Sequence, residues 1–224
     1  MVQNGILPQK GGHCALRVVG SCGVFTPDAL RAAAQVAERC GGGRVTATSR
    51  GTLEIDRIPA QRLDEAVALA GALGLKLGGT GATVRAVAAC KGTDCRRGVF
   101  DTHRLALQLD RAFFGAPVPK KFKIGVYGCP NSLGKARGQD VGILPAPGEA
   151  GRFLLFVGGM MGRRPRLGDA LGSALPESAL VEAVGRVLAF YRRHGAEGQR
   201  LGDLLEAGGA PLFAQLQAEL KELA

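Results

Sequence analysis

The chain has 224 residues, 46% of them hydrophobic and 21% charged, which excludes wholesale disorder. No stretch approaches the roughly 20 apolar residues of a membrane span, and no basic segment followed by an apolar one opens the chain, so we expect a cytoplasmic protein. The 29 Lys and Arg against 19 Asp and Glu give a net charge of +10, which favours an anionic partner, although two Tyr and no Trp argue against a nucleic acid.

The first third of the chain predicts a small α+β unit. We expect a strand over 15–20, a helix over 26–39, strand structure over 44–58 and a helix over 60–73. Thr26 is placed to cap the first helix and Pro27 to occupy its first position. The alternation of apolar residues slips near Gly51, which divides the strand region in two. The β-α-β-β-α order indicates a ferredoxin-like half-domain at residues 1–78.

The remainder of the chain, residues 79–224, predicts a mixed α/β domain after a glycine-rich break. Strands are expected over 83–90, 121–129, 140–145 and 152–159. Helices are expected over 101–115, 177–195 and 211–224.

Three of the six cysteines, Cys90, Cys95 and Cys129, fall on loops just after strand candidates. Thiolates at strand ends are a normal way to ligate an iron–sulfur cluster, which usually takes four cysteines. The alternative is that each is a small buried apolar residue. A zinc site is disfavoured, because the sequence has neither a C-x2-C pair nor a closely spaced His pair.

Four cations accompany these cysteines. Lys121 and Lys123 lie upstream of Cys129 and project from the same face of an extended strand, while Arg85 lies on the strand that leads into Cys90. Arg50 ends an earlier strand. Their joint placement predicts a pocket for a small oxyanion beside the cysteines, with a solvated basic face as the alternative.

Five successive blocks resemble the sirohaem-dependent sulfite and nitrite reductases, most closely the small single-module forms. These blocks are residues 44–55, 81–102, 119–143, 156–168 and 187–209. The resemblance implies an oxidoreductase that reduces sulfite or nitrite by six electrons on sirohaem and a [4Fe–4S] cluster. An external electron donor protein is implied as well, because no G-x-G-x-x-G fingerprint for a flavin or nicotinamide follows a strand.

The resemblance also implies the site residues. The cluster ligands would be Cys90, Cys95 and Cys129. The substrate anion would be held by Arg50, Arg85, Lys121 and Lys123. The sirohaem would be held by Arg50, Thr52 and Asn131.

The sequence departs from the family pattern at two cluster positions. Four residues separate the first two cysteines where the family has five, and Leu133 stands where the family has its fourth, bridging cysteine. A three-cysteine site would leave one iron open, or the cluster would be absent, or electrons would reach the haem without a bridge. Alternatively, Cys14, Cys22 or Cys40 would replace the missing thiolate, with Cys22 favoured by its loop position.

Two further functions stay open at this point. One is a non-catalytic or electron-relaying relative that binds tetrapyrrole, cluster or both. The other is a precorrin-modifying enzyme on the same fold. Larger family members carry two copies of this module, so we expect one copy per chain to be completed by a homodimer or by a related partner chain, with a monomer as the alternative.

Overall fold

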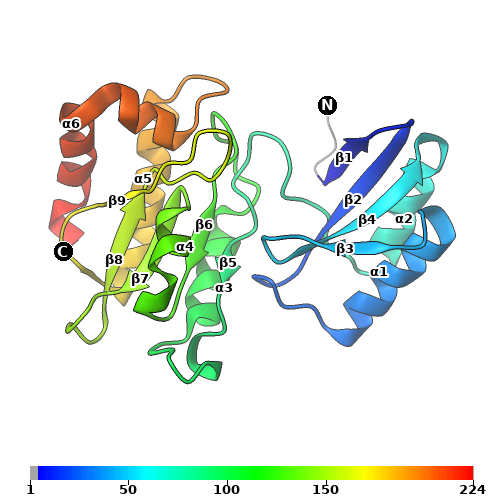
Figure 1. The fold of residues 1–224 in the computed structure, drawn as a ribbon, viewed down its shortest axis with the longest axis horizontal. Coiled ribbons are helices and arrows are strands. Elements are labelled where there is room, and N and C mark those ends of the chain that lie inside the picture. Colours follow the sequence, from blue (N-terminus) through cyan, green and yellow to red (C-terminus); the bar gives the residue numbers. More distant parts are fainter. Residues whose placement is uncertain (1–4, 224) are drawn as a thin grey trace. The chain divides into compact units, whose positions relative to one another are not determined.

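The computed structural model describes residues 5–223, which form two compact units, one ending at Gly81 and one beginning at Ala82. Each unit has its own sheet and helices (Figure 1). None of the helices within the described range is both long and apolar enough to cross a bilayer.

The first unit is a four-stranded antiparallel sheet in the order β1-β2-β4-β3 with two helices. The strands are β1 (Ile6–Gln9), β2 (His13–Val19), β3 (Val45–Ala47) and β4 (Thr52–Pro59). The helices are α1 (Pro27–Cys40) and α2 (Leu63–Ala72). Apolar residues of the sheet and both helices share one core, in which Leu16, Val36 and Ile55 are fully buried. The expected strand–helix–strand–strand–helix order is confirmed, and β1 is an additional edge strand.

Local signals in this unit act as expected. The hydroxyl of Thr26 accepts a hydrogen bond from the N–H of Ala29 at 3.1 Å, which caps α1. The slip near Gly51 is the turn between β3 and β4, closed by the N–H of Thr48 donating to the carbonyl of Thr52 at 2.8 Å. Strand β1 escapes sequence reasoning because it is four residues long and contains Pro8, which breaks the strand pattern.

The second unit is a mixed sheet in the order β10-β8-β7-β6-β5, with β9 paired to β8. The strands are β5 (Ala88–Ala89), β6 (Ile124–Val126), β7 (Val141–Pro145), β8 (Arg152–Val157), β9 (Asp169–Ala170) and β10 (Leu175–Pro176). The helices are α3 (Thr102–Phe113), α4 (Leu133–Arg137), α5 (Leu180–His194) and α6 (Leu201–Leu220). β5, β6 and β7 run parallel, whereas β7 and β8 are antiparallel. The short helix α4 packs so closely on β7 that a Cβ at Gly142 would lie 2.0 Å from the carbonyl oxygen of Ala136.

Two expected strands are shorter than their apolar runs. Only two residues of 83–90 and three of 121–129 form regular strands, as β5 and β6. The two segments nevertheless stay side by side, because an isolated parallel bridge joins Val84 to Phe122 ahead of the strands.

The last helix begins earlier than the sequence indicated. α6 starts at Leu201, ten residues before the expected start at Pro211, and Gly209 interrupts it with a non-helical φ of 58° and ψ of −158°. The sequence therefore predicted only the second half, which begins at Pro211. Gly208 and Gly209 are poor helix formers, and they obscure the helical pattern of the first half. The expected helix end at Ala224 lies outside the described residues.

Candidate functional site

Cys90 and Cys129 lie at the same edge of the second sheet. They follow the neighbouring parallel strands β5 and β6, so both loops leave from the carboxyl ends of those strands. The N–H of Cys90 donates to the carbonyl of Val126 at 3.1 Å, and the N–H of Gly128 donates to the sulfur of Cys90 at 3.1 Å. The two loops are thus joined through backbone and sulfur.

Cys95 is held in a tight turn over residues 92–98. Its N–H donates to the carbonyl of Gly92 at 3.0 Å, and its carbonyl accepts from the N–H of Gly98 at 2.8 Å. A Cβ at Gly98 would lie 1.8 Å from the carbonyl oxygen of Gly92, so this turn requires glycine. The turn is fastened to the loop of Cys129, because the N–H of Val99 donates to the carbonyl of Gly128 at 3.0 Å. We call Cys90, Cys95 and Cys129 the cysteine edge.

The cysteine edge supplies three of the four thiolates that a [4Fe–4S] cluster usually takes. All three cysteines are half-buried, and the sulfur of Cys90 also accepts from the N–H of Gly92 at 3.5 Å. Hydrogen bonds of this kind to ligand sulfurs are one way a protein tunes a cluster. The fourth position holds Leu133, whose side chain is 43% exposed at the start of α4 and has no metal-binding atom. Within residues 5–223, no three His, Cys, Asp or Glu side chains are grouped closely enough to hold a metal ion, so convergence of the thiolates stays a prediction.

The three other cysteines belong to the first unit. Cys22 and Cys40 are buried there, and Cys14 is half-buried in β2. Replacement of the missing thiolate by one of them, including the favoured Cys22, stays a prediction that no contact in the structure tests.

Arg85, Lys121 and Lys123 project from one face of two adjacent extended segments. Phe122 is fully buried and stacks on Tyr191, with ring centroids 5.7 Å apart, so alternation directs the side chains of Lys121 and Lys123 to the opposite face. The N–H of Arg85 donates to the carbonyl of Phe122 at 2.8 Å, which brings the guanidinium-bearing residue alongside. We call Arg85, Lys121 and Lys123 the cation face.

The neighbouring positive charges change the pKa of Lys121. Burial lowers the pKa of its ammonium, and the charges of Arg200, Arg85 and Lys120 lower that pKa further, while Asp140 opposes them. A lysine of this kind binds an anion strongly, because the anion relieves the repulsion, and it gives up a proton more readily than an exposed lysine.

The cation face and the cysteine edge are separated along their strands. Arg85, Lys121 and Lys123 precede β5 and β6, whereas Cys90 and Cys129 follow them, so the two sets lie at opposite ends of the same strands. Placement of the oxyanion pocket beside the cysteines therefore stays a prediction.

The remaining expected residues lie elsewhere. Arg50 and Thr52 belong to the β3–β4 turn of the first unit, where the hydroxyls of Thr48 and Thr52 are 2.7 Å apart. Asn131 is exposed in the turn after Cys129. Their expected roles toward sirohaem and substrate stay predictions.

Sequence reasoning missed a buried ion pair behind the cation face. Asp140 and Arg200 are 0% and 8% exposed, and an oxygen of Asp140 lies 2.7 Å from the guanidinium of Arg200. Burial raises the pKa of Asp140, and Arg200 acts against that rise. The available signal was an Asp directly before the apolar run of β7, but its partner is 60 residues away in the sequence.

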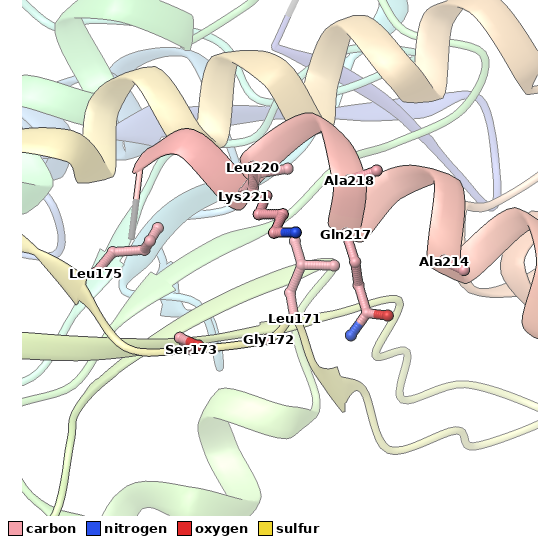
Figure 2. Close-up of a pocket in the computed structure, with 9 residues that line it drawn as sticks. All are labelled: Leu171, Gly172, Ser173, Leu175, Ala214, Gln217, Ala218, Leu220 and Lys221. Atoms are coloured by element: carbon pink, nitrogen blue, oxygen red, sulfur yellow. The ribbon is translucent and has the colours of Figure 1, made fainter.

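A separate cavity of about 280 Å³ lies between the β9–β10 segment and the second half of α6 (Figure 2). Its lining is Leu171, Gly172, Ser173, Leu175, Ala214, Gln217, Ala218, Leu220 and Lys221. Figure 2 shows Gln217 and Lys221 reaching from the helix toward the segment below. The lining contains no cysteine and none of the expected site residues, so we do not assign the cavity to the site.

Comparison with known proteins matches both units. Residues 80–222 match the family model of the nitrite and sulphite reductase 4Fe-4S domain, and residues 7–73 match that of the nitrite/sulfite reductase ferredoxin-like half domain. The α+β fold with a ferredoxin-like half-domain is thereby confirmed.

Two curated relatives illustrate the range of sizes. The assimilatory-type sulfite reductase of Nitratidesulfovibrio vulgaris is 28% identical over 198 residues, which cover 87% of each chain. The large subunit of nitrite reductase [NAD(P)H] of Klebsiella oxytoca is 34% identical over 214 residues, but this chain spans only 21% of it.

Two solved structures share the fold. The NirA protein of Mycobacterium tuberculosis has a TM-score of 0.79 at 20% identity, covering 94% of this chain and 40% of NirA. Dissimilatory sulfite reductase I has a TM-score of 0.78 at 15% identity, covering 96% of this chain and 76% of that one.

Proposed function

The chain belongs to the nitrite and sulphite reductase family, and on that premise we propose that it is an oxidoreductase that reduces sulfite or nitrite with electrons from an external donor protein. The observation that carries this proposal is the cation face. Three cations on neighbouring extended segments, backed by a fully buried aromatic residue, form a fixed surface of the right charge for a small oxyanion.

We further propose that the family's cofactors bind this chain. Cys90, Cys95 and Cys129 would hold the iron–sulfur cluster, and Arg50, Thr52 and Asn131 would contact the sirohaem. When bound, these groups would supply the iron that takes electrons from the donor and passes them to the substrate.

The chain's own residues would then bind the anion and move protons. Arg85 and Lys123 would offset the charge of the bound oxyanion, together with Arg50. Lys121 would donate a proton to an oxygen of the substrate as its bond to sulfur or nitrogen breaks, which its lowered pKa favours.

The separation of cations from cysteines supports a homodimer. The cation face and the cysteine edge lie at opposite ends of β6, so a second copy placed in the reverse direction would bring its cation face to the cysteine edge of the first. The dimer proposed from the single copy of the module therefore also gives a way to complete each site. We place this dimer in the cytoplasm.

A second function is favoured by one observation, the exposed Leu133 at the fourth cluster position. Without the bridging thiolate, the chain would bind tetrapyrrole or cluster and relay electrons, or bind without catalysis.

Anaerobic reconstitution tests the two functions. The chain is loaded with iron, sulfide and sirohaem, and iron, sulfide and tetrapyrrole are counted on the same sample that gives the absorption spectrum. Sulfite and nitrite consumption is then followed with reduced methyl viologen as electron donor. We expect consumption of one or both anions, and a Lys121→Met variant with unchanged iron content to lose most of it. A fully loaded protein that consumes neither anion would contradict the reductase and support the relaying relative.

A further inference from the structure

We propose that the buried Asp140–Arg200 ion pair positions the cation face, so that Asp140 and Arg200 are positioning residues for anion binding. The inference rests on the proposed function of Lys121 and Lys123. It assigns a role to two residues that contact neither the cysteine edge nor the expected sirohaem residues.

Asp140 and its neighbour hold Lys123 by both of its backbone groups. The N–H of Lys123 donates to the carboxylate of Asp140 at 2.8 Å, and the carbonyl of Lys123 accepts from the N–H of Val141 at 3.0 Å. With both groups bound, the backbone of Lys123 is restrained, and so is the direction in which its side chain leaves the strand.

The segment is held a second time from the same loop. The hydroxyl of Tyr191 donates to the carbonyl of Gln199, and the Tyr191 ring stacks on Phe122 with ring centroids 5.7 Å apart. Gln199 directly precedes Arg200, whose guanidinium binds Asp140 through Nε at 3.2 Å and Nη2 at 2.7 Å. The loop before α6 therefore supports Phe122 through Tyr191 and Lys123 through Asp140.

The pair has a property that an apolar contact or a lone carboxylate would lack. Replacing a buried ion pair by apolar residues is often neutral or stabilising, so stability alone does not explain its presence. A lone carboxylate behind three cations would attract one of them and weaken the anion site. With Arg200 bound to it, Asp140 accepts the N–H of Lys123 and leaves the positive charge of the cation face intact.

Charges around Lys121 agree with this arrangement. Arg85 faces it from the neighbouring segment, Lys120 adjoins it in the chain, and Arg200 and Asp140 act on it from behind. Arg200 lowers the pKa of Lys121 and Asp140 raises it, so the charges of the pair act on the cation face.

Two double variants separate positioning from charge. Asp140→Asn with Arg200→Gln removes both charges but keeps an oxygen for the N–H of Lys123. Asp140→Leu with Arg200→Leu removes the charges and that oxygen, while leaving no buried charge unpaired, so both variants are expected to fold. The matched control is Arg104→Gln with Glu177→Gln, an exposed ion pair of 2.5 Å in the same unit.

The first measurements use the cofactor-free chain. Hydrogen exchange at the amide of Lys123 and the titration of Lys121 are followed by NMR with labelled lysine. In the leucine variant we expect exchange at least 10-fold faster at Lys123, and the pKa of Lys121 returned toward that of an exposed lysine. In the Asn/Gln variant exchange stays within about threefold of wild type.

The reconstituted enzyme gives the second readout. We expect the leucine variant to raise the sulfite KM at least 10-fold with a smaller change in kcat, and the Asn/Gln variant to recover most of this loss. A folded leucine variant with the wild-type Lys121 titration and KM overturns the proposal. If the wild type reduces no anion, the proposed function fails, and the two NMR measurements still decide whether the pair positions the segment.

Discussion

The turn that holds Cys95 depends on the absence of a side chain at Gly98, so Gly98→Ala tests whether this turn positions Cys95. The added methyl group would lie 1.8 Å from the carbonyl oxygen of Gly92, far inside van der Waals contact, and that oxygen belongs to the backbone, which cannot rotate away as a side chain can. The turn must therefore open. Opening it breaks the hydrogen bonds from Cys95 to Gly92 (3.0 Å), from Gly98 to Cys95 (2.8 Å) and from Val99 to Gly128 (3.0 Å).

Each of these backbone hydrogen bonds contributes about 1 kcal/mol, so we expect Gly98→Ala to lower the free energy of unfolding by about 2–4 kcal/mol. Displacing Cys95 also removes one of the three thiolates, so reconstituted chain should retain less iron than wild type. Denaturant unfolding of the cofactor-free chain measures the first effect, and iron and sulfide analysis after gel filtration measures the second.

Gly134→Ala is the matched control, because Gly134 is an exposed residue of α4 and a Cβ there would meet no atom within 4 Å. Alanine is favoured over glycine in a helix, so this variant should be as stable as wild type or more stable by up to about 1 kcal/mol. If Gly98→Ala unfolds like the wild type and retains as much iron, the turn does not position Cys95 as described.

Three further predictions address the missing ligand, the first unit and its pH dependence. Leu133→Cys should raise retained iron and sulfide toward about four of each per chain, whereas Leu167→Cys, at another exposed leucine, should leave both unchanged; equal gains would contradict a specific fourth position. Thr26→Ala removes the hydroxyl that accepts from the N–H of Ala29 and should cost about 1 kcal/mol in denaturant unfolding, while Thr26→Ser should restore stability. Burial raises the pKa of the Cys40 thiol, so the folded chain keeps a proton that the unfolded chain loses; stability should fall as pH rises above the pKa of an unperturbed thiol, about 8.5, and Cys40→Ala should flatten that fall.

Much of the fold follows from local signals. Thr26 and Pro27 mark the start of α1, the slip at Gly51 marks a turn, and the apolar runs of β7 and β8 locate the centre of the second sheet. Each signal acts within a few residues, which is why sequence reasoning reads it correctly.

The candidate site was predictable only in part, because its geometry depends on strand direction and long-range pairing. The sequence indicated that Cys90 and Cys129 follow strands, but only the parallel pairing of β5 and β6 brings them to one edge. The cation face lies at the opposite end, because Lys123 precedes β6 and Cys129 follows it. The pairing of Asp140 with Arg200 joins two loops that no local pattern connects.

The break in α6 at Gly209 gives the two halves of that helix different partners. Its first half begins at Leu201, after Arg200, whose N–H donates to the carboxylate of Asp203 at 3.4 Å. Its second half is attached to α5 through Arg193 and Glu219. A left-handed residue between the halves transmits little bending or twist from one to the other. We therefore expect substitutions at exposed positions beyond Gly209 to disturb Arg200 less than substitutions in the first half of the helix.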